Sequence, residues 1–150
     1  MEQRFETFTV QIAKISRCIR KIKTAEMAEF DLKSPHVSCL YYLYKNLNSM
    51  TAKELCDICE EDKAAISRAI SYLEENGYIE CISKTEKRYK SPLMLTKKGK
   101  QVGEKIAVKV DHILDLASPG LSAKEREEFY QTLTFISNNL QKICDKYDGE

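Results

Sequence analysis

Glycine, proline and histidine are scarce in this chain, which contains five, three and two of them among 150 residues. Phosphate loops and nucleophile elbows are built on closely spaced glycines, and the sequence contains neither motif. The two histidines, His36 and His112, form no recognisable pair with a catalytic carboxylate and share no recurring spacing. These absences argue against an enzyme and give little support to a histidine-based metal site.

Long hydrophobic runs are also missing. No stretch approaches the roughly 20 apolar residues that a membrane-spanning helix needs, and the first residues, MEQRFETF, lack the basic start and apolar run of a signal peptide. We therefore expect a cytoplasmic protein with no membrane partner, whose six cysteines are free thiols. With 43% apolar and 31% charged residues, a chain of this length is typical of a single globular domain.

A large charge excess of either sign is absent too, since the net charge is only +1. The distribution is less even. Residues 84–105 contain eight Lys or Arg and two Glu, a local charge of +6 that leaves −5 for the remainder. An isolated run of this kind is most often a solvated surface. This basic run directly follows residues 51–79, which predict a pair of short helices, and that position makes a functional role more plausible.

The stretch from residue 51 to residue 79, TAKELCDICEEDKAAISRAISYLEENGYI, predicts two short helices separated by a turn. Thr51 and Glu54 form a capping box for the first helix, which we expect over about 52–59. Asp62 is a good N-cap for the second helix, whose apolar stripe is formed by Ile66, Ala69, Ile70 and Leu73. The stripe must be buried, so the opposite face is exposed; it contains Ala64, Arg68, Ser71 and Glu75, with Lys63 and Ser67 along its edge.

A pair of strands is predicted after this helix. Asn76-Gly77 ends the helix, and residues 78–83 alternate and are rich in strand-forming types. A second candidate strand covers residues 93–96, and the polar, basic loop KTEKRYKSP lies between the two. Pro92 is expected only at an edge position, because it cannot donate a ladder hydrogen bond. Two helices followed by strand, basic loop and strand outline a winged helix.

Two helices are predicted before this unit. Residues 1–28 form one long helix with a narrow apolar seam of Phe5, Phe8, Ile12, Ile15, Ile19 and Ile22. Four basic residues lie off this seam and are expected to be solvated, with a DNA-facing role as the alternative, namely Arg17, Arg20, Lys21 and Lys23. Ser34 as N-cap and Pro35 as first helical residue start the second helix, whose buried face contains Val37, Leu40, Tyr41 and Tyr44. Residues 46–50 are expected to be a loop.

Two more helices follow the strands. Thr96 caps a helix that extends to about Ala117, with an apolar stripe of Val102, Ile106, Val110 and Ile113. Pro119-Gly120 ends it, and Ser122 with Glu125 forms a capping box for the last helix. The seam of that helix contains Phe129, Leu133, Ile136, Leu140, Ile143 and Tyr147. The two terminal seams either join the helices of two subunits, which is the more economical arrangement, or pack on each other within one monomer.

The order of these elements, together with TAKEL, DKAAISRAISYLEENGYIE, the basic loop and LTKKG, resembles the MarR family of bacterial transcriptional regulators. The resemblance implies a mainly α fold with a small β-wing: a winged helix-turn-helix plus N- and C-terminal dimerisation helices. It implies a single domain over 1–150, with dimerisation helices at about 1–32 and 97–147 and a DNA-binding lobe at about 34–96. The protein would be a homodimeric repressor that binds a pseudo-palindromic operator in double-stranded DNA and responds to a small-molecule effector.

The same resemblance implies roles for individual residues. Four of them match the exposed start of the family's recognition helix, where they would face base edges: Lys63, Ala64, Ser67 and Arg68. Arg88 matches the Arg at the wing tip that enters the minor groove, and three residues are expected to contact phosphates: Thr51, Lys87 and Lys90. One departure concerns the turn, where the family usually has Gly and an apolar residue and this chain has Glu60 and Glu61.

Other chemistry remains open at a few positions. Cys56 and Cys59 form a CxxC, but no second cysteine pair completes a zinc site, so we expect core cysteines, no bound metal and no cofactor. The family's ligand crevice would be lined by Cys18, Ile22, His36, Cys39 and His112. Two alternatives are a thiol- or metal-responsive regulator of the same fold and a winged helix used only for protein contacts. The basic surface of the second helix and wing argues against the latter.

Overall fold

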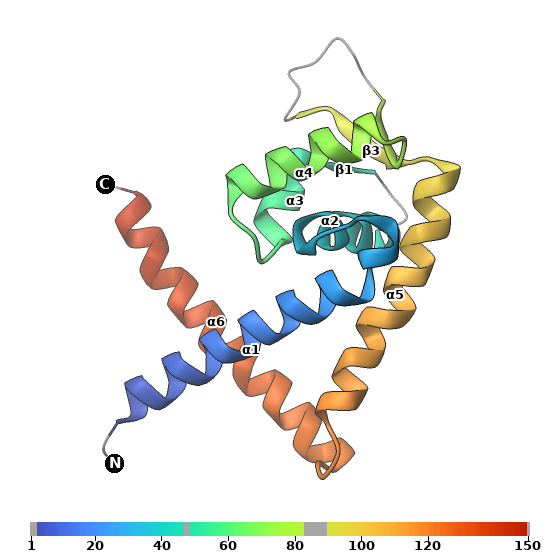
Figure 1. Ribbon diagram of the computed structural model, residues 1–150. Helices are drawn as coiled ribbons and strands as arrows, with labels where there is room; N and C mark the ends of the chain where they lie inside the picture. Colours follow the sequence, from blue (N-terminus) through green and yellow to red (C-terminus); the bar gives the residue numbers. More distant parts are fainter. Residues whose placement is uncertain (1–2, 47–48, 83–89, 150) are drawn as a thin grey trace. The chain divides into compact units, whose positions relative to one another are not determined.

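The computed structural model describes residues 3–46, 49–82 and 90–149, which are mainly helical with one small sheet (Figure 1). The helices of the described chain are α1 (Arg4–Glu26), α2 (Ser34–Lys45), α3 (Ala52–Ile58), α4 (Lys63–Glu75), α5 (Lys97–Ala117) and α6 (Ala123–Asp148), with a 3-10 turn at Ala28–Phe30. The strands are β1 (Met50–Thr51), β2 (Ile79–Cys81) and β3 (Pro92–Leu95). The predicted fold class is therefore confirmed. The chain divides into two compact units, residues 1–113 and 114–150.

Local capping signals place the central helices where the sequence predicts them. The Thr51 hydroxyl accepts a hydrogen bond from the Glu54 N–H at 3.1 Å, and the Glu54 carboxylate accepts one from the Thr51 N–H at 2.9 Å. An Asp62 carboxylate oxygen accepts from the Ala65 N–H at 2.7 Å and so caps α4. Each cap satisfies backbone donors that the helix itself leaves unpaired. The two helices and the turn between them are confirmed.

The sheet differs from the prediction at its centre. Its order is β1-β3-β2, and both pairings are antiparallel. The expectation of a loop over residues 46–50 is wrong at its end, because Met50 pairs with Leu93 in β1. The edge position expected for Pro92 is also wrong. Pro92 is the first residue of the central strand, where its carbonyl accepts from the Ile82 N–H at 3.0 Å and no donor is required of it.

The start of α2 is shifted by one residue. Lys33 occupies the N-cap position, and Ser34 and Pro35 are the first two helical residues. The Ser34 hydroxyl donates to a Glu61 carboxylate oxygen at 2.8 Å. In its place, His36 Nδ1 accepts from the Lys33 N–H at 3.0 Å. The predicted N-cap role of Ser34 is therefore wrong, because a carboxylate from a distant turn engages its hydroxyl.

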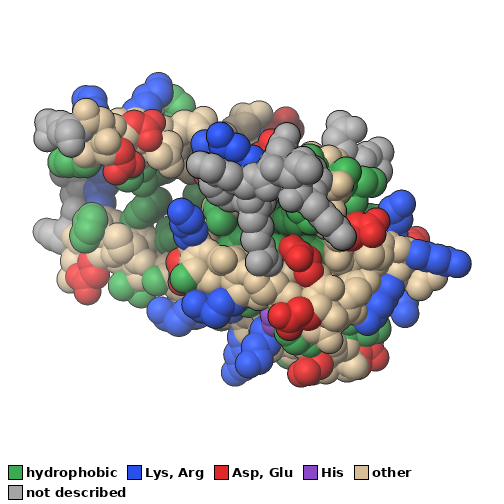
Figure 2. All heavy atoms as spheres, turned by 90° about the horizontal axis from the view of Figure 1, so that it is seen from above, with side chains coloured by type: hydrophobic (Ala, Val, Ile, Leu, Met, Phe, Trp, Pro, Cys, Tyr) green, Lys and Arg blue, Asp and Glu red, His purple; other side chains and the backbone are tan. Residues whose placement is uncertain are grey.

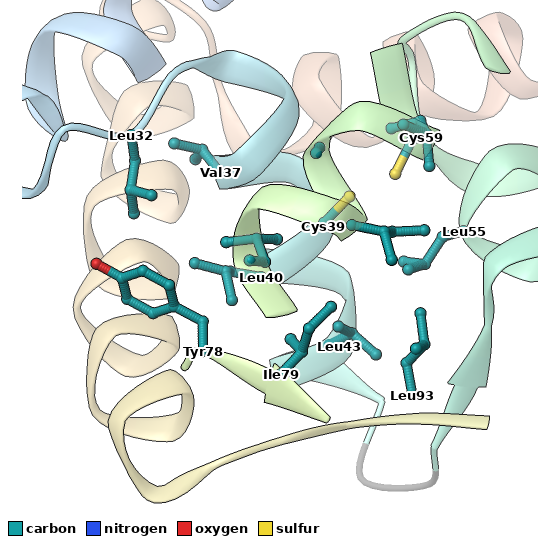
Figure 3. Close-up of a cluster of buried hydrophobic side chains, with 14 of the residues drawn as sticks. Leu32, Val37, Cys39, Leu40, Leu43, Leu55, Cys59, Tyr78, Ile79 and Leu93 are labelled. Atoms are coloured by element: carbon teal, nitrogen blue, oxygen red, sulfur yellow. The ribbon is translucent and has the colours of Figure 1, made fainter. Parts of the chain in front are cut away.

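The core of the first unit joins α2, α3, α4, α5 and the sheet. Figure 3 shows Leu40 and Leu43 of α2 converging with Leu55 of α3 and with Ile79 and Leu93 of the strands. The predicted α4 stripe of Ile66, Ala69, Ile70 and Leu73 is buried in this core. The stripe expected on α5 is buried at Val102 and Ile106 and half-buried at Val110 and Ile113. Tyr41 and Tyr44 are half-buried.

Helices α1 and α6 keep most of their apolar seams exposed, and Ile19, Leu133 and Ile136 are half-buried. On α1, which is shorter than the predicted 1–28, Phe5 is 81% exposed, and Phe8, Ile12, Ile15 and Ile22 are exposed too. Within the second unit, α6 begins at the predicted capping box of Ser122 and Glu125 and contains no buried residue. Among the described residues, no helix combines the length and the hydropathy that crossing a membrane would require.

Gly99 marks a close approach that a side chain would prevent. A Cβ at this position would collide with the backbone carbonyl oxygen of Tyr78, which α5 passes as it begins. We expect Gly99→Ala to destabilise the protein by about 1–3 kcal/mol, the usual range for overpacking in a rigid site. Gly149→Ala is the control, since its Cβ would make only an ordinary contact with Asp145. Urea unfolding of both variants measures the difference, and equal midpoints would contradict the close packing.

Candidate nucleic-acid interface

The exposed side of α4 presents a short polar and basic surface. Lys63, Ala64, Ser67 and Arg68 are all exposed, opposite the stripe buried in the core. No hydrogen bond or ion pair to another described residue holds the side chains of Ser67 and Arg68. A hydroxyl and a guanidinium with free donors can bond base edges or phosphate oxygens. The start of α4 thus offers these groups to a ligand outside the protein.

The remaining predicted DNA contacts lie on other segments or outside the described residues. Thr51 is half-buried, and its hydroxyl acts as acceptor in the α3 cap, so its own proton remains able to donate. Lys90 is exposed. Lys87 and Arg88 lie outside the described residues. Among the described residues, Figure 2 shows Lys and Arg side chains interspersed with acidic ones on the face seen from above.

The turn between α3 and α4 is attached to α1 and α2 through Glu60. Its Oε1 accepts hydrogen bonds from Lys23 Nζ on α1 and, at 2.9 Å, from the Ser38 hydroxyl on α2. Lys23 Nζ also donates to the Ser38 hydroxyl at 2.6 Å. The Lys23 side chain is only 4% exposed, so the expectation that it is solvated is wrong. We call Glu60, Lys23 and Ser38 the Glu60 triad.

A second set of contacts repeats this arrangement at Glu61. Its Oε2 forms an ion pair with Arg20 of α1 at 3.2 Å, and its Oε1 accepts from the Ser34 hydroxyl of α2 at 2.8 Å. The Glu61 side chain is 4% exposed, whereas that of Arg20 is 57% exposed. We call Glu61, Arg20 and Ser34 the Glu61 triad. Each triad takes one residue from α1, one from α2 and one from the turn.

The electrostatics of the Glu60 triad favour its charged form. Burial alone would raise the pKa of Glu60, but the hydrogen bond and the positive charge of Lys23 outweigh it, so the pKa lies below its ordinary value. Burial, followed by the nearby Glu60 charge, raises the pKa of Tyr42 to about 12. The Tyr42 hydroxyl is therefore protonated at neutral pH, and it donates to Glu60 Oε2 at 3.4 Å.

Sequence reasoning missed the two triads as a unit. The available signal was the pair of acids in a turn where the family pattern has Gly and an apolar residue. Neither Lys23 nor the two serines carry a local pattern that predicts a buried partner. Only the packing of α1 and α2 against the turn brings the six side chains together.

The predicted effector residues occupy different surroundings. Cys18 and Ile22 are exposed on α1, and His112 is exposed on α5. His36 is half-buried and stacks on Tyr72 of α4 with ring centroids 4.3 Å apart, whereas Cys39 is fully buried. No hydrogen bond or ring contact joins any two of these five residues. They remain a prediction, separate from a cavity of about 440 Å³ lined by Tyr44, Leu93, Lys97 and neighbouring residues.

The cysteines are free thiols in several environments. Cys39 and Cys59 are buried, and Figure 3 shows their sulfur atoms directed toward each other. The hydrogen bond with Cys59, together with burial, raises the pKa of Cys39, so its reactive thiolate is disfavoured. Of the two cysteines expected in the core, Cys59 is buried and Cys56 is half-buried, whereas Cys18 and Cys144 are exposed. Within the described ranges, no group of three or more His, Cys, Asp or Glu residues could hold a metal ion.

Comparisons with known proteins agree with this geometry. A family model described as the MarR family matches residues 30–88. YwoH of Bacillus subtilis (strain 168), an uncharacterised HTH-type transcriptional regulator, is 33% identical over 100 residues, covering 67% of this chain and 72% of that protein. YybA of the same strain is also an uncharacterised HTH-type transcriptional regulator and is 25% identical over 132 residues. The match covers 88% of this chain and 87% of YybA.

The fold matches solved structures as well. A crystal structure described as a MarR family transcriptional regulator from Listeria monocytogenes complexed with 26mer DNA gives a TM-score of 0.79 at 25% identity. The match covers 88% of this chain and 87% of that chain. The transcriptional regulator SlyA, at 24% identity and a TM-score of 0.80, shares the fold over 90% of this chain and 94% of its own.

His36 gives the stability of the first unit a pH dependence. Burial, followed by the charge of Lys33, lowers the pKa of His36 below 6.5, and its Nδ1 must be unprotonated to accept from the Lys33 N–H. Its contribution is therefore complete above about pH 6.5, the unfolded pKa, and is lost as the pH falls through the lower folded pKa. We expect the thermal unfolding midpoint to decrease when the pH is lowered from 7.5 to 5.5, and to decrease less in His36→Gln. An equal decrease of the midpoint in the wild type and in His36→Gln would contradict this role.

Proposed function

The chain belongs to the MarR family of transcriptional regulators, and we propose that it acts as a homodimer that binds pseudo-palindromic DNA and represses transcription until a small molecule releases it. The observation that carries this proposal is the start of α4, where Ser67 and Arg68 are exposed above a buried stripe and bond to no other residue that the structure describes. The DNA-bound Listeria relative, which has the same fold, supports it.

The start of α4 is suited to the major groove. Two adjacent pairs of residues, four positions apart, share one end and one face of the helix. They are Lys63 with Ala64 and Ser67 with Arg68. We assign base reading to Arg68, whose guanidinium can bond O6 and N7 of a guanine, and to Ser67. Ala64 lets the helix approach closely, and Lys63 adds a positive charge near the phosphates. Thr51, Lys87, Lys90 and Arg88 complete the proposed contacts.

The proposed homodimer follows from the exposed seams of α1 and α6. Phe5 on α1, and Phe129 and Leu140 on α6, are among the large apolar side chains that remain at least half or nearly half exposed. Exposed rows of large apolar side chains usually mark an interface in a protein that stays dispersed in water. A second copy would cover both seams and relate the two α4 helices by a two-fold axis. Such a dimer reads half-sites about one helical turn apart.

The effector response is the least constrained part of the proposal. Cys18, Ile22, His36, Cys39 and His112 remain the residues predicted to respond to it. Among these residues, His36 stacks its ring on Tyr72 of α4, which is the helix that we propose reads the DNA bases and that we call the reading helix. A ligand that displaced His36 would therefore act on α4 without touching the DNA.

Arg68→Ala tests base reading. We expect the loss of one bidentate contact to cost about 1–3 kcal/mol at the recognised base and to relax preference there. DNA selected from a random pool by the wild-type protein supplies the operator, which should be an inverted repeat. Lys124→Ala on α6 is the control, because it also removes one exposed positive charge but at a position outside the proposed DNA contacts. Equal affinity and base preference in wild type and Arg68→Ala would contradict the proposal.

Ile143→Glu tests the dimer. A charge in the α6 seam should oppose association, because a buried carboxylate without a partner is strongly unfavourable. We expect the variant to sediment as a monomer and to lose most of its affinity for the inverted repeat. Asn138→Glu introduces the same charge on α6 outside the seam and should remain dimeric. If wild-type protein is monomeric at micromolar concentration, the seams pack within one chain and the homodimer is refuted.

A further inference from the structure

Two consecutive acids hold the turn of the helix-turn-helix at two points. In the Glu60 triad the carboxylate contacts Lys23 and Ser38, and in the Glu61 triad it contacts Arg20 and Ser34. Arg20 and Lys23 are three residues apart on α1, and the two serines are four residues apart on α2. Each pair therefore lies on one face of its helix. One attachment would leave the turn free to pivot, whereas two separated attachments define its orientation.

The triads lie immediately before the reading helix. Asp62, which follows Glu61, caps α4 through its bond to the Ala65 N–H. Because no flexible segment separates the triads from the cap, the position of Glu60 and Glu61 determines where α4 begins. On the other side, Arg20 and Lys23 belong to the same helix as the exposed apolar seam that includes Phe8 and Ile12. The triads thus connect that helix with the start of α4.

Stability alone does not account for this arrangement. Each ion pair has one buried member, Lys23 or Glu61, whereas the partners Glu60 and Arg20 remain 42% and 57% exposed. Removing a charge from water is costly, and a well-packed apolar residue at such a site often gives equal or greater stability. A hydrogen-bonded ion pair does impose direction, since each donor and acceptor must meet its partner in a narrow geometry. Lys23 illustrates the constraint, because its ammonium group is buried and depends on Ser38 and Glu60 for its hydrogen bonds.

The geometry points to Glu60 and Glu61 as positioning residues that set the orientation of the reading helix relative to α1 and thereby its specificity for DNA. This inference rests on the proposed DNA binding. It adds that a displacement of α1 at a subunit interface is carried to α4 through the two triads. Neither carboxylate contacts DNA in this account, because Glu60 is bonded to Lys23 and Ser38 and Glu61 is bonded to Arg20 and Ser34.

The sign of the effect on DNA affinity separates positioning from electrostatics. Glu60→Gln/Glu61→Gln removes two negative charges next to the reading helix, and charge alone would then strengthen binding to all DNA. We expect the opposite for the selected operator, a loss of about tenfold, within the usual range for coupled sites. Affinity for a shuffled duplex should not fall. Asp57→Asn removes an exposed charge from α3 and should leave the operator preference unchanged.

Two further variants separate positioning from folding. In Lys23→Met/Glu60→Gln both charges of the pair are absent, so no uncompensated charge remains at the buried Lys23 position and the fold should be retained. We expect its operator preference to fall while its thermal midpoint stays near that of the wild type. Arg20→Lys keeps the positive charge that faces Glu61 and should retain the preference. A preference equal to that of the wild type in both Glu60 variants would overturn the inference.

Amide hydrogen exchange provides a readout that does not involve DNA. We expect faster exchange in the first turn of α4, residues 63–67, in Glu60→Gln/Glu61→Gln, with the core amides of α2 still protected. If wild-type protein showed no preference for any selected DNA, the proposed function would fail. The exchange rates in the first turn of α4 would still show whether Glu60 and Glu61 hold that turn in place. Unchanged exchange in the first turn would overturn the positioning role whatever the DNA result.

Discussion

The burial of one side of α4 is the constraint on which the rest of the structure depends. Ile66 and Leu73 are fully buried, and they pack in a core shared with α2, α3 and the sheet. Each such side chain contributes roughly 1.5–3 kcal/mol when it leaves water, whereas Ser67 and Arg68 gain nothing from burial. The helix can therefore rest on the core in only one rotation. The direction of its polar face is a consequence of the apolar packing beneath it.

Rotation about the helix axis is only part of the placement of α4, because its starting point must be fixed as well. The apolar stripe tolerates small shifts along the core, since dispersion contacts have little directional preference. The Glu60 and Glu61 triads are directional, and they bond the turn to α1 and α2. Apolar packing and directed ion pairs thus constrain different degrees of freedom of the same helix.

This division helps to explain how the fold is shared at low identity. The chain superimposes on MarR regulators with TM-scores near 0.8 although only about a quarter of the aligned residues are identical. A core tolerates exchanges among apolar residues of similar volume, so the fold survives them. The turn is one place where this chain departs from the pattern expected of its family, with two acids in place of Gly and an apolar residue. The partners of those acids on α1 and α2 make the departure compatible with the same fold.

The sequence by itself determined the features that depend on neighbours within a few residues. The caps at Thr51, Asp62 and Ser122 and the stripe of α4 follow from local hydrogen bonds and helical periodicity, so they could be read directly. Tertiary structure decided the pairing of Met50 with Leu93, the central position of Pro92 and the burial of Lys23. The same holds for the diversion of the Ser34 hydroxyl to Glu61. In each of these cases the partner lies far away in the sequence, and only the packing of the core brings it within bonding distance.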